Sequence, residues 1–192
     1  MRLVQAGAEV VKIERPEGDF ARGYDTAVAG NSSYFVWLNA GKKSVVLDLR
    51  RSDQVALLSR LIVQSDIFIQ NLKPGALAKL GFELDALHAE HPCLISMSIS
   101  GFAEDGPGRH RKAYDLLMQA ESGLSAITGS HHAAGRVGVS LVDIATGQFA
   151  YEAILGALIQ RGQNGRGAKL SVSLFDAVAQ WLAVPYLSLI HI

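Results

Sequence analysis

Arginine and asparagine residues follow the predicted strands, at the ends where a parallel sheet binds its ligand. Arg15, Arg50 and Asn71 each directly follow an apolar segment that is predicted to be a strand. In an open parallel sheet the carboxyl ends of the strands share one edge, and ligands bind in the crevice there. Guanidinium groups form charge-assisted, bidentate hydrogen bonds with phosphate. The pattern therefore predicts a phosphorylated, nucleotide-like ligand, and a solvated basic rim is the alternative interpretation.

The other side chains that could do chemistry lack the partners that common motifs require. The run Gly41-Lys42-Lys43-Ser44 has Val36 where a phosphate-binding P-loop needs glycine. No dinucleotide fingerprint follows the first predicted strand, and no nucleophile elbow occurs. His131 and His132 have no Cys or carboxylate at metal-ligand spacing, so no metal site is predicted. Cys93 precedes an apolar strand and is interpreted as inert core.

Short apolar strands that alternate with helices must position these residues. Residues rich in Val and Ile predict strands, and apolar residues at helical spacing predict helices. The predicted strands span residues 9–14, 44–49, 66–70, 94–98 and 169–174, and the predicted helices span 52–64, 75–80, 84–91, 115–125, 141–161 and 175–189. Residues 16–33 are predicted to be a loop, and Pro185 is expected to break the last helix. This order predicts an α/β fold, a Rossmann-like open parallel sheet with flanking helices.

The composition excludes several classes of protein. The 192 residues carry 18 Lys plus Arg against 18 Asp plus Glu, and this zero net charge argues against a nucleic-acid binder. The single cysteine excludes an internal disulfide framework. The two longest apolar stretches, residues 141–159 and 175–192, are interrupted by Asp, Gln, Glu or Pro and are not predicted to span a membrane. With no targeting segment visible, the predicted location is the cytoplasm.

Six segments in register resemble the family III CoA-transferases, which are related to alpha-methylacyl-CoA racemase. They are residues 7–19, 38–49, 70–81, 98–107, 114–123 and 165–177. Each motif is weak by itself, but together they cover essentially the whole chain. The resemblance implies a CoA thioester as substrate, with no tightly bound cofactor, and transfer of CoA to a small carboxylic acid.

The family nucleophile is an aspartate that follows the Tyr-Asp-Leu helix and a glycine-containing linker. The matching residue is Asp143, which would attack the thioester to form an aspartyl anhydride and then an aspartyl-CoA thioester. From the residues alone, Asp143 is an acidic residue at a helix start, where backbone N–H groups would hold the carboxylate in place and keep it ionised. The two interpretations are compatible.

The resemblance also implies contacts with CoA and with the acyl group. Arg15 would face the nucleotide, Leu47 and Arg50 would border the adenine and its phosphates, and Tyr114 would line the acyl site. The remaining implied CoA contacts are Asn71, Lys79 and Lys112. Asp115 is either a structural helix cap or a charge near the site.

One position separates transferase from racemase within this superfamily. The racemase branch has a histidine where this chain has Tyr114. Racemisation needs two bases flanking the alpha carbon, and a tyrosine with an ordinary pKa near 10 replaces histidine poorly. Transferase is therefore favoured, and a racemase-like enzyme and an inactive CoA-binding fragment are the alternatives.

The resemblance implies that the chain is a fragment. Residues 1–192 would form a large CoA-binding and catalytic domain that is incomplete at both ends, and the small C-terminal domain of family members would be absent. Residues 188–192 do not resemble family sequence. Family members form intertwined homodimers, so this assembly is expected for the full-length form.

Overall fold

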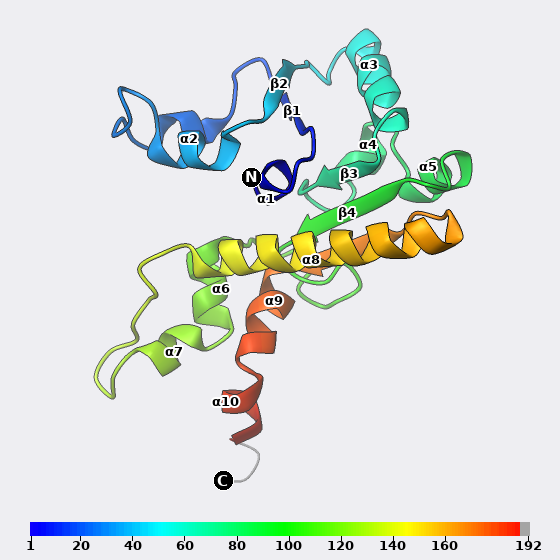
Figure 1. The fold of residues 1–192 in the computed structure, drawn as a ribbon. Coiled ribbons are helices and arrows are strands. Elements are labelled where there is room, and N and C mark those ends of the chain that lie inside the picture. Colours follow the sequence, from blue (N-terminus) through cyan, green and yellow to red (C-terminus); the bar gives the residue numbers. More distant parts are fainter. Residues whose placement is uncertain (189–192) are drawn as a thin grey trace. The chain divides into compact units, whose positions relative to one another are not determined.

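The computed structural model describes residues 1–188 and divides into two compact units, residues 1–64 and the part from Ser65 onward. Each unit contains its own parallel sheet flanked by helices (Figure 1). Of the unusual terminal segment 188–192, only Ser188 lies within the described residues.

The first unit is built on a two-stranded parallel sheet. Its elements are α1 (Arg2–Gln5), β1 (Val11–Glu14), the 3-10 helix η1 (Phe20–Gly23), α2 (Ser33–Asn39), β2 (Lys43–Val46) and α3 (Ser52–Val63). Glu14 lies opposite Val46 at the end of the ladder, and the N–H of Leu47 donates to the Glu14 carbonyl over 2.9 Å. The carboxyl ends of both strands therefore lie side by side.

The second unit is built on a three-stranded parallel sheet in the order β3-β4-β5. Its elements are β3 (Ile67–Gln70), α4 (Ala76–Lys79), α5 (Leu84–Glu90), β4 (Ile95–Ser100), α6 (Asp115–Glu121), α7 (Leu124–Thr128), α8 (Leu141–Asn164), β5 (Lys169–Ser173), α9 (Leu174–Trp181) and α10 (Ala183–Ser188). The central strand β4 is buried over Ile95–Ser98, as expected for a parallel strand covered on both faces.

The long helix α8 passes along the sheet and packs against β4, β5, α6 and α9 (Figure 1). Among the described residues it is the one helix long and apolar enough to meet a length-and-composition test for a membrane span. Its buried residues, which include Val142, Ala150 and Ile154, line the interior of the unit. One third of its most apolar 18-residue window is buried inside the protein.

The parallel α/β architecture is confirmed, but the strands form two sheets where one was predicted. Arg15 and Arg50 follow strands of the first sheet, whereas Asn71 follows β3 in the second. The prediction that all three share one sheet edge is therefore wrong. Local patterns indicate which residues are extended, but hydrogen bonds between segments distant in sequence decide which strands pair.

Three helix predictions also differ from the structure. Helix α2 was missed, although Ser32 is its N-cap and accepts the Phe35 N–H over 3.3 Å, which is a recognisable start signal. The helix predicted over 115–125 divides at Gly123, whose φ of 74° favours glycine. The last helix breaks at Leu182 and not at Pro185, because a proline is tolerated in the first turn of α10.

Alanine at Gly167 is expected to destabilise the second unit by about 2–3 kcal/mol. A Cβ there would overlap the carbonyl oxygen of Leu94, and this backbone cannot move aside because the Gly167 N–H donates to the Pro92 carbonyl over 2.8 Å. The matched control is Gly162→Ala in α8, where a Cβ meets open space and should stabilise by about 1 kcal/mol. Urea unfolding measures both, and equal stability of the two variants would contradict the expected close contact.

Candidate active site

The first turns of α6 and α8 meet at two aspartates. Asp115 is the first residue of α6, and Asp143 lies in the first turn of α8. The Asp115 carboxylate accepts the backbone N–H of Val142 over 2.7 Å and that of Asp143 over 3.3 Å. Ser140, the N-cap of α8 by position, makes no side-chain capping hydrogen bond. Asp115 is therefore a cap supplied by another helix, which is one of the two roles that the sequence offered for it.

The buried amide of Gln119 completes this arrangement. Its Nε2 donates to the second oxygen of Asp115 over 2.8 Å, and its Oε1 accepts the N–H of Val137 over 2.8 Å. Gln119 thus ties α6 to the segment that leads into α8. Sequence reasoning gave this residue no role, although an amide beside Met118 on a buried helix face is a signal that it has a polar partner.

An apolar cluster packs beside the first turns of α6 and α8 and fixes their positions relative to each other. Met118, Val142, Val178 and Leu182 are buried together, and Phe102 and Phe175 pack against them with stacked rings 5.5 Å apart. Because Val142 is fixed in this cluster and its N–H is held by Asp115, the adjacent Asp143 has little freedom to shift.

The electrostatics of Asp143 differ from the prediction. Partial desolvation by surrounding protein atoms, together with the charge of Asp115, raises the pKa of Asp143, although the residue is still reached by solvent. The idea that backbone N–H groups keep this carboxylate ionised is therefore wrong, because the N–H groups of Val142 and Asp143 donate to Asp115. The sequence placed Asp143 at a helix start correctly but could not show which carboxylate accepts from the helix.

Asp143→Asn is expected to raise stability modestly at neutral pH. A carboxylate whose pKa is raised in the folded state destabilises that state when ionised, and this cost shrinks as the pH falls below the folded-state pKa and is gone below the unfolded-state pKa. The difference in urea midpoint between variant and native protein should therefore be largest near pH 7 and shrink toward pH 4. A difference that grows on acidification would contradict this assignment.

Tyr114 and Lys112 are exposed residues that come just before α6 in the chain. Tyr114 is the residue before α6 and its side chain is 70% exposed. Lys112, two residues earlier, is also exposed. The backbone therefore places the predicted acyl-site tyrosine directly next to Asp115, which contacts the Asp143 backbone.

In the first unit, Arg15, Leu47 and Arg50 gather at the carboxyl edge of the sheet. Arg15 is exposed and Leu47 is 5% exposed. The Arg50 guanidinium forms two hydrogen bonds with Asp48, of 2.7 and 2.9 Å. These bonds and the charges of Asp48 and Glu17 raise the pKa of Arg50.

In the second unit, Asn71 and Lys79 are both exposed, after β3 and at the end of α4. The side chain of Gln70 holds the start of this connection, because its oxygen accepts the Leu72 N–H over 2.7 Å and its nitrogen donates to Ser98 over 3.0 Å. Cys93 is exposed, so its interpretation as core is wrong. Within residues 1–188, no group of three His, Cys, Asp or Glu side chains is placed to hold a metal ion.

Comparison with known proteins gives one consistent result. The sequence model of CoA-transferase family III matches residues 1–190. The chain is 38% identical over 183 residues to the acetyl-CoA:oxalate CoA-transferase of Acetobacter aceti, covering 94% of this chain and 47% of that protein. It is 37% identical over 180 residues to the succinyl-CoA:glutarate CoA-transferase of Mus musculus, covering 92% of this chain and 41% of that protein.

The fold comparison agrees. The crystal structure of a CaiB/BaiF family protein from Brucella suis matches with a TM-score of 0.90 at 36% identity, over 97% of this chain and 52% of that chain. The chain spans about half the length of the relatives it matches, since it covers 47% of the first and 41% of the second. Because the family model matches nearly every residue, and relatives of over 30% identity align along almost the whole chain, this chain belongs to CoA-transferase family III.

Proposed function

We propose that this chain is part of a longer polypeptide that transfers CoA from an acyl-CoA thioester to a carboxylic acid, with Asp143 as the nucleophile. The observation that carries the proposal is the solvent-accessible carboxylate at the head of α8, whose helix N–H groups are occupied by Asp115. The names of the relatives agree with it, since they include oxalate, glutarate and malate CoA-transferases. The carboxylic acid is therefore expected to be small.

The proposed reaction proceeds through two kinds of covalent intermediate. The Asp143 carboxylate attacks the thioester carbonyl, the C–S bond breaks, and CoA leaves as a thiolate from a mixed anhydride. The thiolate attacks the aspartyl carbonyl, which releases the donor carboxylate and leaves an aspartyl-CoA thioester. The acceptor carboxylate displaces the thiolate, and the thiolate then attacks the acceptor carbonyl, forming the product thioester and regenerating the Asp143 carboxylate.

The environment of Asp143 suits a nucleophile. A carboxylate whose pKa is raised is more basic and less stabilised as an anion than an ordinary one. The backbone N–H groups of Val142 and Asp143 donate to Asp115 and therefore do not stabilise the negative charge of the Asp143 carboxylate. Asp115 would act as a positioning residue in this scheme, since its bonds are to the backbone of α8.

CoA would be bound by the residues that the family resemblance implies. These are Arg15, Leu47, Arg50, Asn71, Lys79 and Lys112, while Tyr114 would line the acyl site. Anhydrides hydrolyse readily, so the reaction requires that water be excluded. In this proposal the missing half of the polypeptide and the partner subunit of an intertwined homodimer cover the site, and the protein acts in the cytoplasm. Residues 1–192 would then belong to one large domain of that protein.

Hydroxylamine trapping tests the proposal. The full-length protein is incubated with acyl-CoA, treated with hydroxylamine, and digested for mass spectrometry. Activated aspartyl carbonyls form a hydroxamate, so the peptide that contains Asp143 should gain the corresponding mass only when acyl-CoA was present. Unmodified Asp143 under turnover conditions would contradict the mechanism. Proton exchange at the substrate alpha carbon without CoA transfer would instead identify a racemase.

A further inference from the structure

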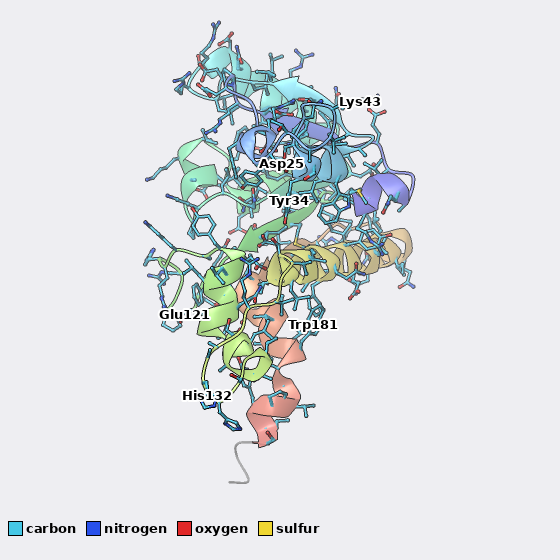
Figure 2. The ribbon with its side chains drawn as sticks, turned by 90° about the vertical axis from the view of Figure 1, so that its left-hand side faces the viewer. Asp25, Tyr34, Lys43, Glu121, His132 and Trp181 are labelled. Atoms are coloured by element: carbon cyan, nitrogen blue, oxygen red, sulfur yellow. The ribbon has the colours of Figure 1, made fainter. Side chains whose placement is uncertain are left out.

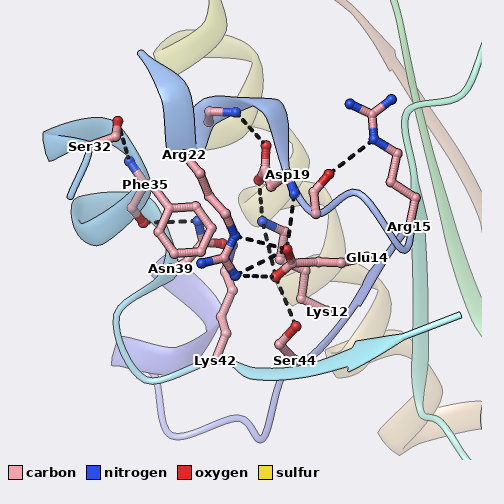
Figure 3. Close-up of polar contacts among 12 residues, drawn as sticks. Lys12, Glu14, Arg15, Asp19, Arg22, Ser32, Phe35, Asn39, Lys42 and Ser44 are labelled. Atoms are coloured by element: carbon pink, nitrogen blue, oxygen red, sulfur yellow. Dashed lines mark hydrogen bonds and ion pairs between the residues drawn. The ribbon is translucent and has the colours of Figure 1, made fainter. Parts of the chain in front are cut away.

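A buried carboxylate at the end of β1 takes no part in the mechanism above. Glu14 is 4% exposed, and burial of an ionised carboxylate is costly unless charged and polar partners compensate. It accepts hydrogen bonds from Ser44 Oγ over 2.8 Å, from Arg22 over 3.2 Å and from the backbone N–H of Asp19 over 3.1 Å (Figure 3). All of these partners belong to the first unit.

Glu14 and its partner Arg22 are held in place by further contacts. Lys12 lies 3.9 Å from Glu14 and pairs with Asp19, and the Arg22 guanidinium stacks 3.8 Å from the centroid of the Phe35 ring (Figure 3). Burial acts to raise the pKa of Glu14, but the bonds from Ser44 and Arg22 and the charge of Lys12 outweigh it and lower the pKa. Glu14 is therefore ionised and fixed.

The bond from Asp19 closes the turn that carries Arg15. Within this turn, the N–H of Gly18 donates to the Arg15 carbonyl over 2.8 Å, and Arg15 Nε donates to the Gly18 carbonyl over 3.0 Å. Glu14 thus joins the two ends of the turn, because it precedes Arg15 directly and accepts from the residue after Gly18. Only the inner nitrogen of the Arg15 guanidinium is bonded within the part of the chain that the structure describes, and its outer fork is exposed.

We infer that Glu14 is a positioning residue for CoA binding, which fixes the turn 15–19 so that the exposed guanidinium fork of Arg15 meets the phosphates of CoA. The inference rests on the proposed function. A guanidinium that is held at Nε and free at its other two nitrogens can bind phosphate bidentately without first being ordered. Arg50 differs, since its fork is already bonded to Asp48.

A double-mutant cycle in the full-length protein tests the inference, with free CoA as the probe and calorimetry as the measurement. Arg15→Ala should weaken CoA binding about tenfold, and Glu14→Gln about three- to tenfold, because the neutral amide pairs less well with Arg22. The essential expectation is that the double variant binds no more weakly than Arg15→Ala alone. Multiplicative effects would assign Glu14 a purely structural role and overturn the inference.

Two further variants control for stability. Asp25→Asn removes the charge of another carboxylate in the first unit (Asp25 is labelled in Figure 2). The Asp25 carboxylate accepts the backbone N–H of Ser33 over 2.9 Å and that of Ala27 over 2.9 Å, and neither of these residues lies in the turn 15–19. Asp25→Asn should leave CoA affinity within about twofold. If Glu14→Gln does not fold, Ser44→Ala removes one bond to Glu14 from an exposed position and should weaken binding in the same direction.

The outcomes separate this inference from the proposed function. If the native protein binds and transfers CoA but Glu14→Gln has the same affinity for CoA, the positioning role alone is overturned. Native protein that binds no CoA overturns the proposed function and the inference together. In turnover assays the Glu14→Gln effect should appear in KM for the thioester and leave kcat nearly unchanged, because in this proposal Arg15 binds the phosphates of CoA and takes no part in the bond-making steps.

Discussion

Asparagine at position 143 is expected to lower the rate of CoA transfer by at least about 10³-fold in the full-length protein. The amide has nearly the shape of the carboxylate but cannot form the anhydride. The hydrogen bonds that organise the start of α8 use backbone N–H groups of Val142 and Asp143, so they remain in the variant. The loss should therefore fall on kcat, while affinity for CoA and the fold are preserved.

The matched control for this substitution is Glu152→Gln. Glu152 lies on the same helix, is exposed, and accepts a hydrogen bond from Gln148 over 3.0 Å. Its removal changes the charge of α8 equally, and it should leave kcat within about twofold. Initial rates with the thioester and hydroxamate formation in both variants give the comparison. An Asp143→Asn variant that retains a tenth of native activity would exclude Asp143 as the nucleophile.

Alanine at Asp115 is expected to destabilise the protein by about 1–3 kcal/mol and to lower kcat about 10²-fold. The substitution leaves the N–H of the buried residue Val142 without its acceptor and removes the main partner of the buried Gln119 amide. Because the same bonds fix the first turn of α8, the Asp143 carboxylate should lose its orientation. Urea unfolding and steady-state kinetics measure the two effects.

Asp115→Asn separates position from charge. An asparagine oxygen can still accept the Val142 N–H, so stability and kcat should lie between those of the native protein and Asp115→Ala. The charge of Asp115 contributes to the raised pKa of Asp143, so the acidic limb of the rate profile should move to lower pH in this variant. A profile that stays in place would show that Asp115 does not act on Asp143 through its charge.

Local sequence patterns and recognisable motifs were enough to predict the secondary-structure elements and the family. Segments rich in Val and Ile predicted β1 and β3, and apolar spacing predicted α3 and α8, because these signals come from residues within one or two turns of each other. The order and spacing of six motifs predicted the family, and the family match over residues 1–190 confirms that prediction. The apolar spacing of residues 141–161 also placed Asp143 at a helix start, and the structure has it in the first turn of α8.

The pairing of these elements and the environment of their charged groups depend on contacts between residues that are far apart in the sequence. Asp115 and the Asp143 backbone are 28 residues apart, and Glu14 and Ser44 are 30 apart, so no local pattern reports either contact. The same limit explains the division into two sheets. The prediction that backbone N–H groups keep Asp143 ionised was wrong because a helix start favours an anion only where its N–H groups are free, and here another helix supplies their acceptor.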